Sequence, residues 1–385
     1  MTTASTPLAT AIVGCGVIGR THVESVLSFS ELALVALIDP VRARADALAD
    51  EVEARTGARP PVFASIDDLV AASVPVRLVV IGTPSGLHVE QGVAALEAGA
   101  HVIIEKPLDV DLVRARRLAE AARAHSGQVC TIISQHRFDP ASRIVHDAIE
   151  AGGFGRLTSA VATVPWWRSQ AYYDSGDWRG TWALDGGGAL MNQGVHTLDL
   201  LLWFLGRPVS VSAEFALLAH EGVEVEDTVV ATITFESGAL AVLHATTAGY
   251  PGLAVRLQVQ GSAGSAVIDS DELEYIHVAD PSGANDMGLQ GGGNQVGRYD
   301  AEPANGVPVD ATQSATGHER QYRDLLDAVA EGRDPIVTVD EALFTLATVR
   351  AVYASATTGR KVAIDDVLAG AYDDVDLVVP IPQRA

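Results

Sequence analysis

Two polar side chains on one segment are the strongest candidates for chemistry in this sequence. Asn192 and His196 follow the glycines 186–188 and stand four residues apart in an otherwise apolar stretch. Residues at this spacing share one face of a helix, and histidine can gain or lose a proton near neutral pH. The pattern therefore suggests acid–base chemistry. A core helix with one hydrogen-bonded histidine would show the same pattern. The motifs in the rest of the chain are needed to choose between a catalytic and a structural role.

A lysine at the end of an apolar strand is the second candidate. Lys106 stands between Glu105 and Pro107, directly after the strand that we expect at 101–104. Its ammonium group could donate a hydrogen bond to a hydroxyl or carbonyl oxygen of a substrate. An ion pair with Glu105 or an exposed charge at the strand end is the structural alternative, but the neighbouring residues favour a functional role.

A glycine turn near the N-terminus indicates a nucleotide site. An apolar strand at 8–13 runs into Gly14, Gly16 and Gly19 in the spacing G-x-G-x-x-G, and a helix is expected at 20–28. In such units the first glycine permits a tight turn, and the third lets the helix pack closely on the strand. The second lets a pyrophosphate approach the positive end of the helix. This strand–turn–helix context predicts a bound dinucleotide.

The acidic residue that ends the second strand indicates which dinucleotide binds. Asp39 follows the apolar strand at 32–38, 20 residues after Gly19. Its carboxylate can accept hydrogen bonds from the adenosine ribose hydroxyls and would repel a 2′-phosphate, which favours NAD. Arg42 and Arg44 follow closely, so NADP stays open.

The alternation of strands and helices continues to about residue 137. Strands at 77–82, 101–104 and 129–134 alternate with helices at 43–55, 65–72, 89–98 and 111–125. This pattern predicts a parallel sheet, whose ligands gather beyond the carboxyl ends of the strands. The strand ends that should converge on one crevice carry Gly14, Asp39, Thr83, Lys106 and Arg137. His88, beside Thr83 and Pro84, has a structural or cofactor-edge role in this interpretation.

Strands dominate after residue 140. They are expected at 157–167, 209–218, 227–235, 239–247, 253–261 and 265–268, with a hairpin turn at Ser237-Gly238. The fold class is therefore α/β, with a parallel N-terminal sheet and a second, mostly antiparallel open sheet. We expect domains at 1–137 and 138–385, with C-terminal helices at 317–330 and 339–357 that can pack back on the first. A sheet with few covering helices leaves a face for oligomerisation.

Aromatic residues are concentrated between residues 165 and 182. The stretch holds four of the five tryptophans and two tyrosines, and our candidate substrate ligands there are Trp166, Trp167, Tyr173 and Trp178. Aromatic faces beside hydrogen-bonding groups suit a sugar ring. A loop that clamps one domain on the other is an equal alternative.

Composition excludes several classes of function. The formal charge of -23 at pH 7 disfavours nucleic acids and anionic membranes as partners. The two cysteines, Cys15 and Cys130, make a disulfide framework or a metal site improbable and fit a reducing cytoplasm. No stretch approaches the roughly 20 apolar residues of a membrane span. The glycine-rich residues 279–315 are expected to form a long loop.

Taken together, these motifs resemble the Gfo/Idh/MocA oxidoreductases, which include glucose–fructose oxidoreductase and inositol 2-dehydrogenase. The resemblance rests on the glycine turn 14–19, on Glu105-Lys106-Pro107 and on the motif 187–196, and it covers nearly the whole chain. It implies a Rossmann domain followed by an open-sheet domain through which dimers or tetramers form. It also implies that Lys106 binds the substrate oxygen and assists proton transfer, and that His196 is the general acid/base.

One residue departs from the pattern of many family dehydrogenases. Asn192 stands where they carry aspartate, and an amide can hydrogen-bond a hydroxyl but cannot take its proton. Asn192 is therefore expected to bind and orient the substrate. The expected cofactor ligands are Gly14, Gly16, Val17, Ile18, Gly19, Asp39, Arg44, Thr83, Pro84, His88, Glu105 and Lys106. The expected substrate ligands are Lys106, Arg137, Asn192, His196 and the four aromatic residues.

The predicted reaction is oxidation of a secondary hydroxyl of a small uncharged polyol by hydride transfer to NAD. The substrate would be a pyranose, an anhydrosugar or glycoside, or an inositol. Two other functions stay open: an NAD-dependent glycosidase that oxidises its substrate transiently, and a sugar- or nucleotide-sensing regulator without catalysis. The presence of both Lys106 and His196 argues against the regulator, since a sensor needs neither.

Overall fold

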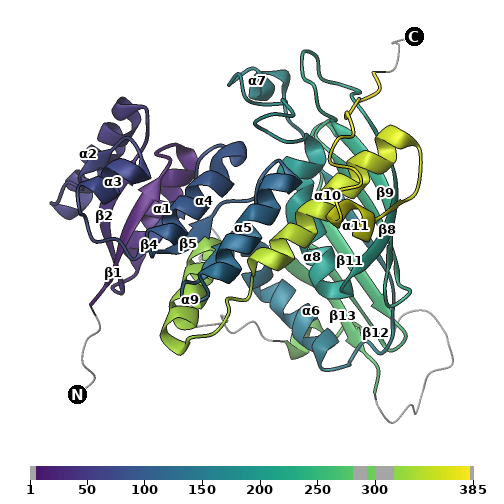
Figure 1. The fold of residues 1–385 in the computed structure, drawn as a ribbon. Coiled ribbons are helices and arrows are strands. Elements are labelled where there is room, and N and C mark those ends of the chain that lie inside the picture. Colours follow the sequence, from purple (N-terminus) through teal and green to yellow (C-terminus); the bar gives the residue numbers. More distant parts are fainter. Residues whose placement is uncertain (1–5, 281–292, 300–315, 382–385) are drawn as a thin grey trace. The chain divides into compact units, whose positions relative to one another are not determined.

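The computed structural model describes residues 6–280, 293–299 and 316–381. The chain divides into two compact units, one formed by residues 1–135 and 307–343, the other by 136–306 and 344–385 (Figure 1). Of the described residues near the C-terminus, 316–343 group with the first unit, and the domain bounds 1–137 and 138–385 stay predictions. The loop expected at 279–315 lies mostly outside the described residues.

The first unit is built on a parallel sheet of six strands in the order β3-β2-β1-β4-β5-β6. Its strands are β1 (Leu8–Val13), β2 (Leu32–Ile38), β3 (Val62–Phe63), β4 (Leu78–Ile81), β5 (His101–Ile104) and β6 (Cys130–Ile132). Its helices are α1 (Val17–Ser28), α2 (Arg42–Thr56), α3 (Ile66–Ala71), α4 (His88–Glu97), α5 (Leu112–Ala124) and α9 (Thr316–Glu331). This strand order, with its reversal between β1 and β4, is that of a Rossmann domain.

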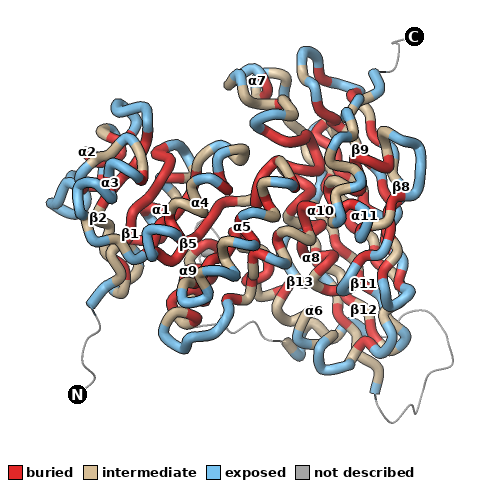
Figure 2. Tube along the Cα trace, in the orientation of Figure 1, coloured by how far each residue is buried: buried red, intermediate tan, exposed pale blue. Residues whose placement is uncertain are grey.

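Continuous apolar runs explain the central strands of that sheet. Every residue of β4 and β5 is buried, as expected where helices cover both faces of a parallel sheet (Figure 2). Helix α9 packs on α1, although about 290 residues separate them in sequence. The expected parallel sheet with intervening helices is confirmed.

The second unit contains a sheet of eight strands in the order β13-β12-β11-β7-β10-β9-β8-β14. Its strands are β7 (Leu157–Pro165), β8 (Pro208–Ala216), β9 (Thr228–Phe235), β10 (Leu240–Thr246), β11 (Arg256–Gly261), β12 (Gly264–Asp269), β13 (Glu272–Val278) and β14 (Val362–Ala363). Its helical segments include α6 (Pro140–Glu150), α7 (Gln170–Tyr173), η3 (Ala189–Gly194), α8 (Val195–Leu205) and α11 (Ile364–Leu368). Helix α10 (Val339–Thr358) begins in the first unit and ends in the second. The strand pairs are antiparallel except β7 with β10, so the expected mostly antiparallel sheet is confirmed.

Among the described residues of this unit, helices pack on one face of the sheet, and the other face carries exposed side chains. Segments α6, η3 and α8 pack on strands β7 and β9–β13. The opposite face presents the exposed apolar side chains of Val230, Leu240 and Val242. Strands β9 and β10 accordingly alternate between buried and open positions, which is typical of a sheet with one face in the core (Figure 2).

The helix after the triple glycine differs from expectation at its start. A π-helical turn, Ala189–Gly194, precedes the regular helix that begins at Val195. Asn192 therefore lies in the π turn and His196 in the α-helix, so the simple four-residue spacing argument does not describe their backbone. π turns occur preferentially at functional positions. Within the described part of the chain, no helix is long and apolar enough to cross a membrane.

Candidate active site

The three glycines of the N-terminal turn have different structural roles. Gly14 has a φ of +94°, and a Cβ there would overlap with the backbone of Gly82. A Cβ on Gly19 would overlap with the carbonyl of Gly14, so helix α1 could not pack on the turn. A Cβ on Gly16 would meet nothing within 4 Å. The fold requires the first and third glycines, whereas the second leaves open space of the kind that a cofactor phosphate occupies.

The N-terminus of α1 has the features of an anion site. Gly16 is its N-cap, no side chain caps the helix, and its first turn holds no acidic residue. The first N–H groups of a helix have no intrahelical partner and carry partial positive charge. Val17, in that first turn and followed by Ile18, is 88% exposed. The glycine turn therefore fits a dinucleotide pyrophosphate, as the sequence predicts.

Asp39 is fixed against this turn. Its Oδ2 accepts a hydrogen bond from the Cys15 backbone N–H at 2.9 Å, and its Oδ1 accepts one from the Val41 N–H at 2.8 Å. Each carboxylate oxygen can accept a further bond, so the residue could also receive ribose hydroxyls. Arg44 is exposed on α2, where its neighbour Arg42 pairs with Asp46.

His88 lies between the loop after β4 and the loop after β5 and contacts a backbone carbonyl of each. The ring of His88 is 1% exposed, with Nε2 at 2.9 Å from the Thr83 carbonyl and Nδ1 at 2.8 Å from the Pro107 carbonyl. The Thr83 hydroxyl donates to Gln91 Oε1 at 2.6 Å, and Pro84 precedes a single helical turn, Ser85–Leu87. His88 thus contacts both loops, and its role at the cofactor edge stays a prediction.

Glu105 lies in a buried cluster that the sequence did not reveal. Its Oε1 is 3.1 Å from Nε2 of His318 and 3.3 Å from Nε2 of His22, and its Oε2 accepts the Lys106 N–H at 3.0 Å. Burial opposes the charge of the carboxylate, but the two histidines outweigh it and hold the pKa of Glu105 well below its usual value. His22 lies in α1 and His318 in α9, far apart in sequence, so no local motif could connect them.

The triple glycine in the second unit packs on Glu226. A Cβ on Gly188 would overlap with the Glu226 carbonyl, and one on Gly187 would overlap with the Tyr353 hydroxyl. The carboxylate of Glu226 accepts the Gly188 N–H and the Leu190 N–H, each at 2.9 Å, and the Tyr353 hydroxyl at 3.1 Å. Burial raises the pKa of Glu226 to about 7 despite these donors. Close backbone packing therefore explains the glycines and positions the π turn.

One stripe of the following helix carries its partly open side chains. From Ala189 to Leu205, only Asn192, His196 and Trp203 are incompletely buried. The amide nitrogen of Asn192 donates to Asp185 Oδ1 at 2.6 Å, and Asp185 Oδ2 accepts the Gly180 N–H at 2.8 Å. Asp185 is a partner that sequence reasoning missed. It fixes the orientation of the Asn192 amide.

His196 packs against a second histidine. The rings of His196 and His136 meet edge to face, with centroids 5.1 Å apart at 80°. Nδ1 of His136 lies 2.8 Å from Asp139 and 3.2 Å from Asp271. Burial alone would lower the pKa of His136, but the two carboxylates raise it to about 10, so the ring is an imidazolium at neutral pH. His136 was also missed, although it directly precedes Arg137.

Arg137 lies inside the second unit. Its Nε and Nη2 donate to the two oxygens of Asp199 at 2.7 and 2.8 Å, the side chain is buried, and the guanidinium stacks on Trp203. Asp199 accepts a further bond from Thr345 at 3.1 Å. Such a bidentate buried pair fixes helix α8 beside the segment after β6. These contacts hold helix α8, which carries His196, and substrate binding by Arg137 stays a prediction.

The aromatic segment contains both buried and partly open rings. Tyr173 is buried, and its hydroxyl bonds to Thr247 Oγ1 at 2.8 Å. Trp166, Trp167 and Trp178 are half-buried. Arg168 lies over the ring of Trp166 and Arg179 over that of Trp178. Tyr173 is thus anchored in the unit, while the tryptophans keep partly open surface.

Within the part of the chain that the structure describes, two clusters have the residue types of a metal site. Atoms of His22, Glu105 and His318, and those of His136, Asp139 and Asp271, lie within 4.8 Å of one another. In each cluster a ring nitrogen hydrogen-bonds a carboxylate, His318 with Glu105 and His136 with Asp139. Hydrogen bonding therefore accounts for the close approach in both.

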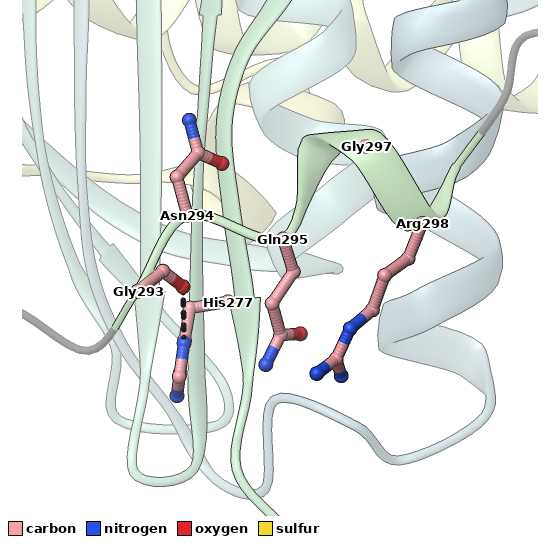
Figure 3. Close-up of a pocket in the computed structure, with 6 residues that line it drawn as sticks. All are labelled: His277, Gly293, Asn294, Gln295, Gly297 and Arg298. Atoms are coloured by element: carbon pink, nitrogen blue, oxygen red, sulfur yellow. Dashed lines mark hydrogen bonds between the residues drawn. The ribbon is translucent and has the colours of Figure 1, made fainter.

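A separate hollow lies at the edge of the second sheet. It encloses about 290 Å³ beside β13, and its lining consists of His277, Gly293, Asn294, Gln295, Gly297 and Arg298 (Figure 3). His277 Nδ1 donates to the Gly293 carbonyl at 2.8 Å. None of the predicted site residues lines this hollow, so it is distinct from the candidate site.

Comparison with known proteins agrees with this geometry. Residues 8–132 match the model of an oxidoreductase family with an NAD-binding Rossmann fold, and residues 142–267 match that of the GFO/IDH/MocA C-terminal domain. The chain is 32% identical to myo-inositol dehydrogenase Hyg17 of Streptomyces leeuwenhoekii, over 74% of this chain and 80% of that protein. It is 30% identical to 1,5-anhydro-D-fructose reductase of Ensifer adhaerens, over 78% of this chain and 83% of that one.

A solved structure extends the similarity to the whole fold. The WlbA dehydrogenase from Bordetella pertussis, in complex with NADH and UDP-GlcNAcA, aligns with a TM-score of 0.80 at 29% identity. The alignment covers 94% of this chain and 99% of that one. The glycine turn, the strand order and both family matches lead to one conclusion: this chain belongs to the Gfo/Idh/MocA family and is an NAD-dependent oxidoreductase.

Proposed function

We propose that the enzyme oxidises a secondary hydroxyl of a pyranose sugar, an anhydrosugar or glycoside, or an inositol. The observation that carries the proposal is the placement of His196 on an open stripe of a buried helix, beside the imidazolium of His136. The names of the relatives support the substrate class, since they denote enzymes of an inositol and of an anhydrosugar.

His196 is the general base of the proposed reaction. It takes the proton of the reacting hydroxyl and returns it in the reverse direction. The ring of His136, held by Asp139 and Asp271, lies beside this base. When bound, NAD supplies the nicotinamide carbon that accepts the hydride.

Lys106 and Asn192 assist the reaction by binding the substrate, while His196 takes the proton. The ammonium group of Lys106 would stabilise the negative charge that develops on the substrate oxygen. Asn192 would hold a neighbouring hydroxyl, because Asp185 fixes the orientation of its amide. An amide cannot accept the proton, so a relay through a carboxylate at position 192 is excluded.

The remaining proposed substrate ligands belong to the second unit. Trp166, Trp167 and Trp178 offer half-buried aromatic faces that suit the C–H faces of a sugar ring. Tyr173 and Arg137 complete the proposed set of substrate ligands, and their polar groups also bond to Thr247 and Asp199. We further propose that a homodimer or homotetramer forms through the uncovered sheet face of Val230, Leu240 and Val242.

A substrate screen tests the proposal. The purified protein is incubated with NAD or NADP and with inositols, aldoses, glycosides and anhydrosugars, and NADH absorbance is followed. The proposal predicts NADH formation with at least one of these polyols and a preference for NAD. Release of free sugar from a glycoside without net NADH would instead identify a glycosidase. Cofactor and ligand binding without turnover on any polyol would indicate the sensing regulator.

A further inference from the structure

Three buried histidines hold the two residues that flank Lys106. His22 and His318 contact Glu105 on one side, and His88 contacts Pro107 on the other. The three rings are 0%, 6% and 1% exposed in this order. They come from α1, α9 and α4, so three separate helices of the first unit converge on one tripeptide.

The Glu105 side of this arrangement is a cluster of buried polar side chains, linked by two hydrogen bonds and by the close approach of His22 to Glu105. The hydroxyl of Tyr322, in α9, lies 3.0 Å from Nδ1 of His22, whose Nε2 faces Glu105. Glu105 in turn accepts the backbone N–H of Lys106. A buried carboxylate is tolerated only where donors surround it. The four side chains therefore fix the backbone immediately before the lysine side chain.

On the other side of Lys106, the ring of His88 contacts the Pro107 carbonyl. A neutral imidazole donates through one nitrogen only, and here both nitrogens face carbonyl oxygens. The tautomer that carries the proton on Nδ1 bonds Pro107, and the other tautomer bonds Thr83. His88 thus lies between the backbone after Lys106 and the loop that follows β4, and its Nδ1–H tautomer holds the Pro107 carbonyl.

We propose that His22, His88 and His318 are positioning residues, which act on the reaction by holding the backbone on both sides of Lys106. The inference rests on the proposed function, in which Lys106 touches the substrate oxygen. Loss of one ring should misplace the ammonium group, and a shift of about 1 Å in a reacting group can reduce turnover by about 100-fold.

Paired variants separate positioning from folding. In His88→Asn the amide replaces Nδ1 and can still reach Pro107, whereas in His88→Gln it replaces Nε2 and reaches Thr83. The inference predicts that His88→Gln lowers kcat by about 10- to 100-fold, with NAD affinity changed less than about threefold. His88→Asn should restore most of the turnover. Equal kcat in the two variants would contradict the role of the Pro107 bond.

A matched control exists for His318. His101 is also 6% exposed and bonds the Val129 backbone N–H, but it lies at the opposite end of β5. His318→Leu should lower kcat and His318→Gln, which keeps a donor near Nε2, should recover it. His101→Leu should lower the melting temperature similarly and leave kcat unchanged. An equal loss of kcat in His318→Leu and His101→Leu would show that His318 has only a structural role.

A double-mutant cycle with Lys106→Met shows whether the histidines act through the lysine. If they do, His88→Gln and His318→Leu cause little further loss of kcat in the Lys106→Met background. Multiplicative losses would overturn the inference while leaving the proposed function intact. Full activity of Lys106→Met itself would refute the role of the lysine in the proposed function, and the two failures are therefore distinguishable.

NMR of labelled lysine residues tests the inference without an activity assay. The chain has only two lysines, Lys106 and Lys361. Protein labelled with 15N-lysine should give two backbone amide signals in NMR, and Lys361→Arg assigns them. The Lys106 signal should shift in His318→Leu and in His88→Gln but not in His101→Leu, with the Lys361 signal as internal reference. A Lys106 signal that is unchanged in the first two variants would overturn the inference.

Discussion

The ring of His196 lies edge to face with the ring of His136, with 5.1 Å between the ring centroids. His136 is held by Asp139 and Asp271, which raise its pKa to about 10, so it stays charged over the working pH range. This relationship gives the proposed base a defined electrostatic environment.

The first prediction concerns the pH profile of His136→Asn. Replacing the imidazolium with a neutral amide, while Asp139 and Asp271 are retained, makes the surroundings of His196 more negative. The base form then appears only at higher pH, so the acid limb of kcat/KM for oxidation should move upward by roughly one unit. His146, whose ring stacks on Trp203 with centroids 3.8 Å apart, serves as control. His146→Asn should leave the limb in place, and a downward move in His136→Asn would contradict the account.

Gly16→Ala and Gly19→Ala should separate cofactor binding from folding. The added methyl group at Gly16 meets open space, so the free energy of unfolding should fall by about 1 kcal/mol or less. NAD affinity should fall at least about tenfold, because the methyl group occupies the phosphate approach. Gly19→Ala should lower the free energy of unfolding by about 2–4 kcal/mol. Calorimetric titration and denaturant unfolding measure the two effects, and unchanged NAD affinity in Gly16→Ala would refute the cofactor assignment of the turn.

Asp39 should determine the choice between NAD and NADP. Asp39→Ala removes the acceptor for ribose hydroxyls together with the charge that repels a 2′-phosphate. The ratio of kcat/KM for NAD over NADP should therefore fall by about 10-fold or more, since one charge-assisted bond contributes about 1.5–3 kcal/mol. Steady-state kinetics with both cofactors measure the ratio. An unchanged ratio would show that other residues set the preference.

The uncovered sheet face should control assembly. Leu240 and Val242 point outward from β10, with 59% and 41% of their surface exposed, and Val230 lies beside them on β9. Leu240→Lys with Val242→Lys would place two like charges on an interface formed through this face, which should dissociate the oligomer. Light scattering coupled to size exclusion gives the mass. A wild-type monomer, or an unchanged oligomer in the variant, would exclude this face.

Local chemistry explains which features could be predicted from the sequence. The glycine turn, Asp39 and the buried strands β4 and β5 depend on neighbouring residues, so their patterns are visible in the chain itself. Strand β13 was missed because its alternating residues include Glu272 and Glu274, which make it look like a polar loop. The π turn was missed because it depends on packing of Gly188 against the distant Glu226.

The same limit applies to the candidate site. Lys106, Asn192 and His196 could be selected because each stands in a recognisable motif. The side chains that support them could not, since His318 reaches Glu105 across 213 positions and Asp271 reaches His136 across 135. Asp185 is close in sequence to Asn192, but its hydrogen bond depends on the turn that brings the two together. Supporting contacts of this kind follow from tertiary structure.

The most direct test of the account is the His196→Ala variant, assayed with the best polyol substrate found in the screen. The account predicts that kcat for NADH formation falls by about 10²- to 10⁴-fold. The dissociation constant for NAD, measured by titration of the same variant, should stay within about threefold of wild type, because the cofactor residues lie in the other unit. Turnover near the wild-type rate would show that His196 is not the general base.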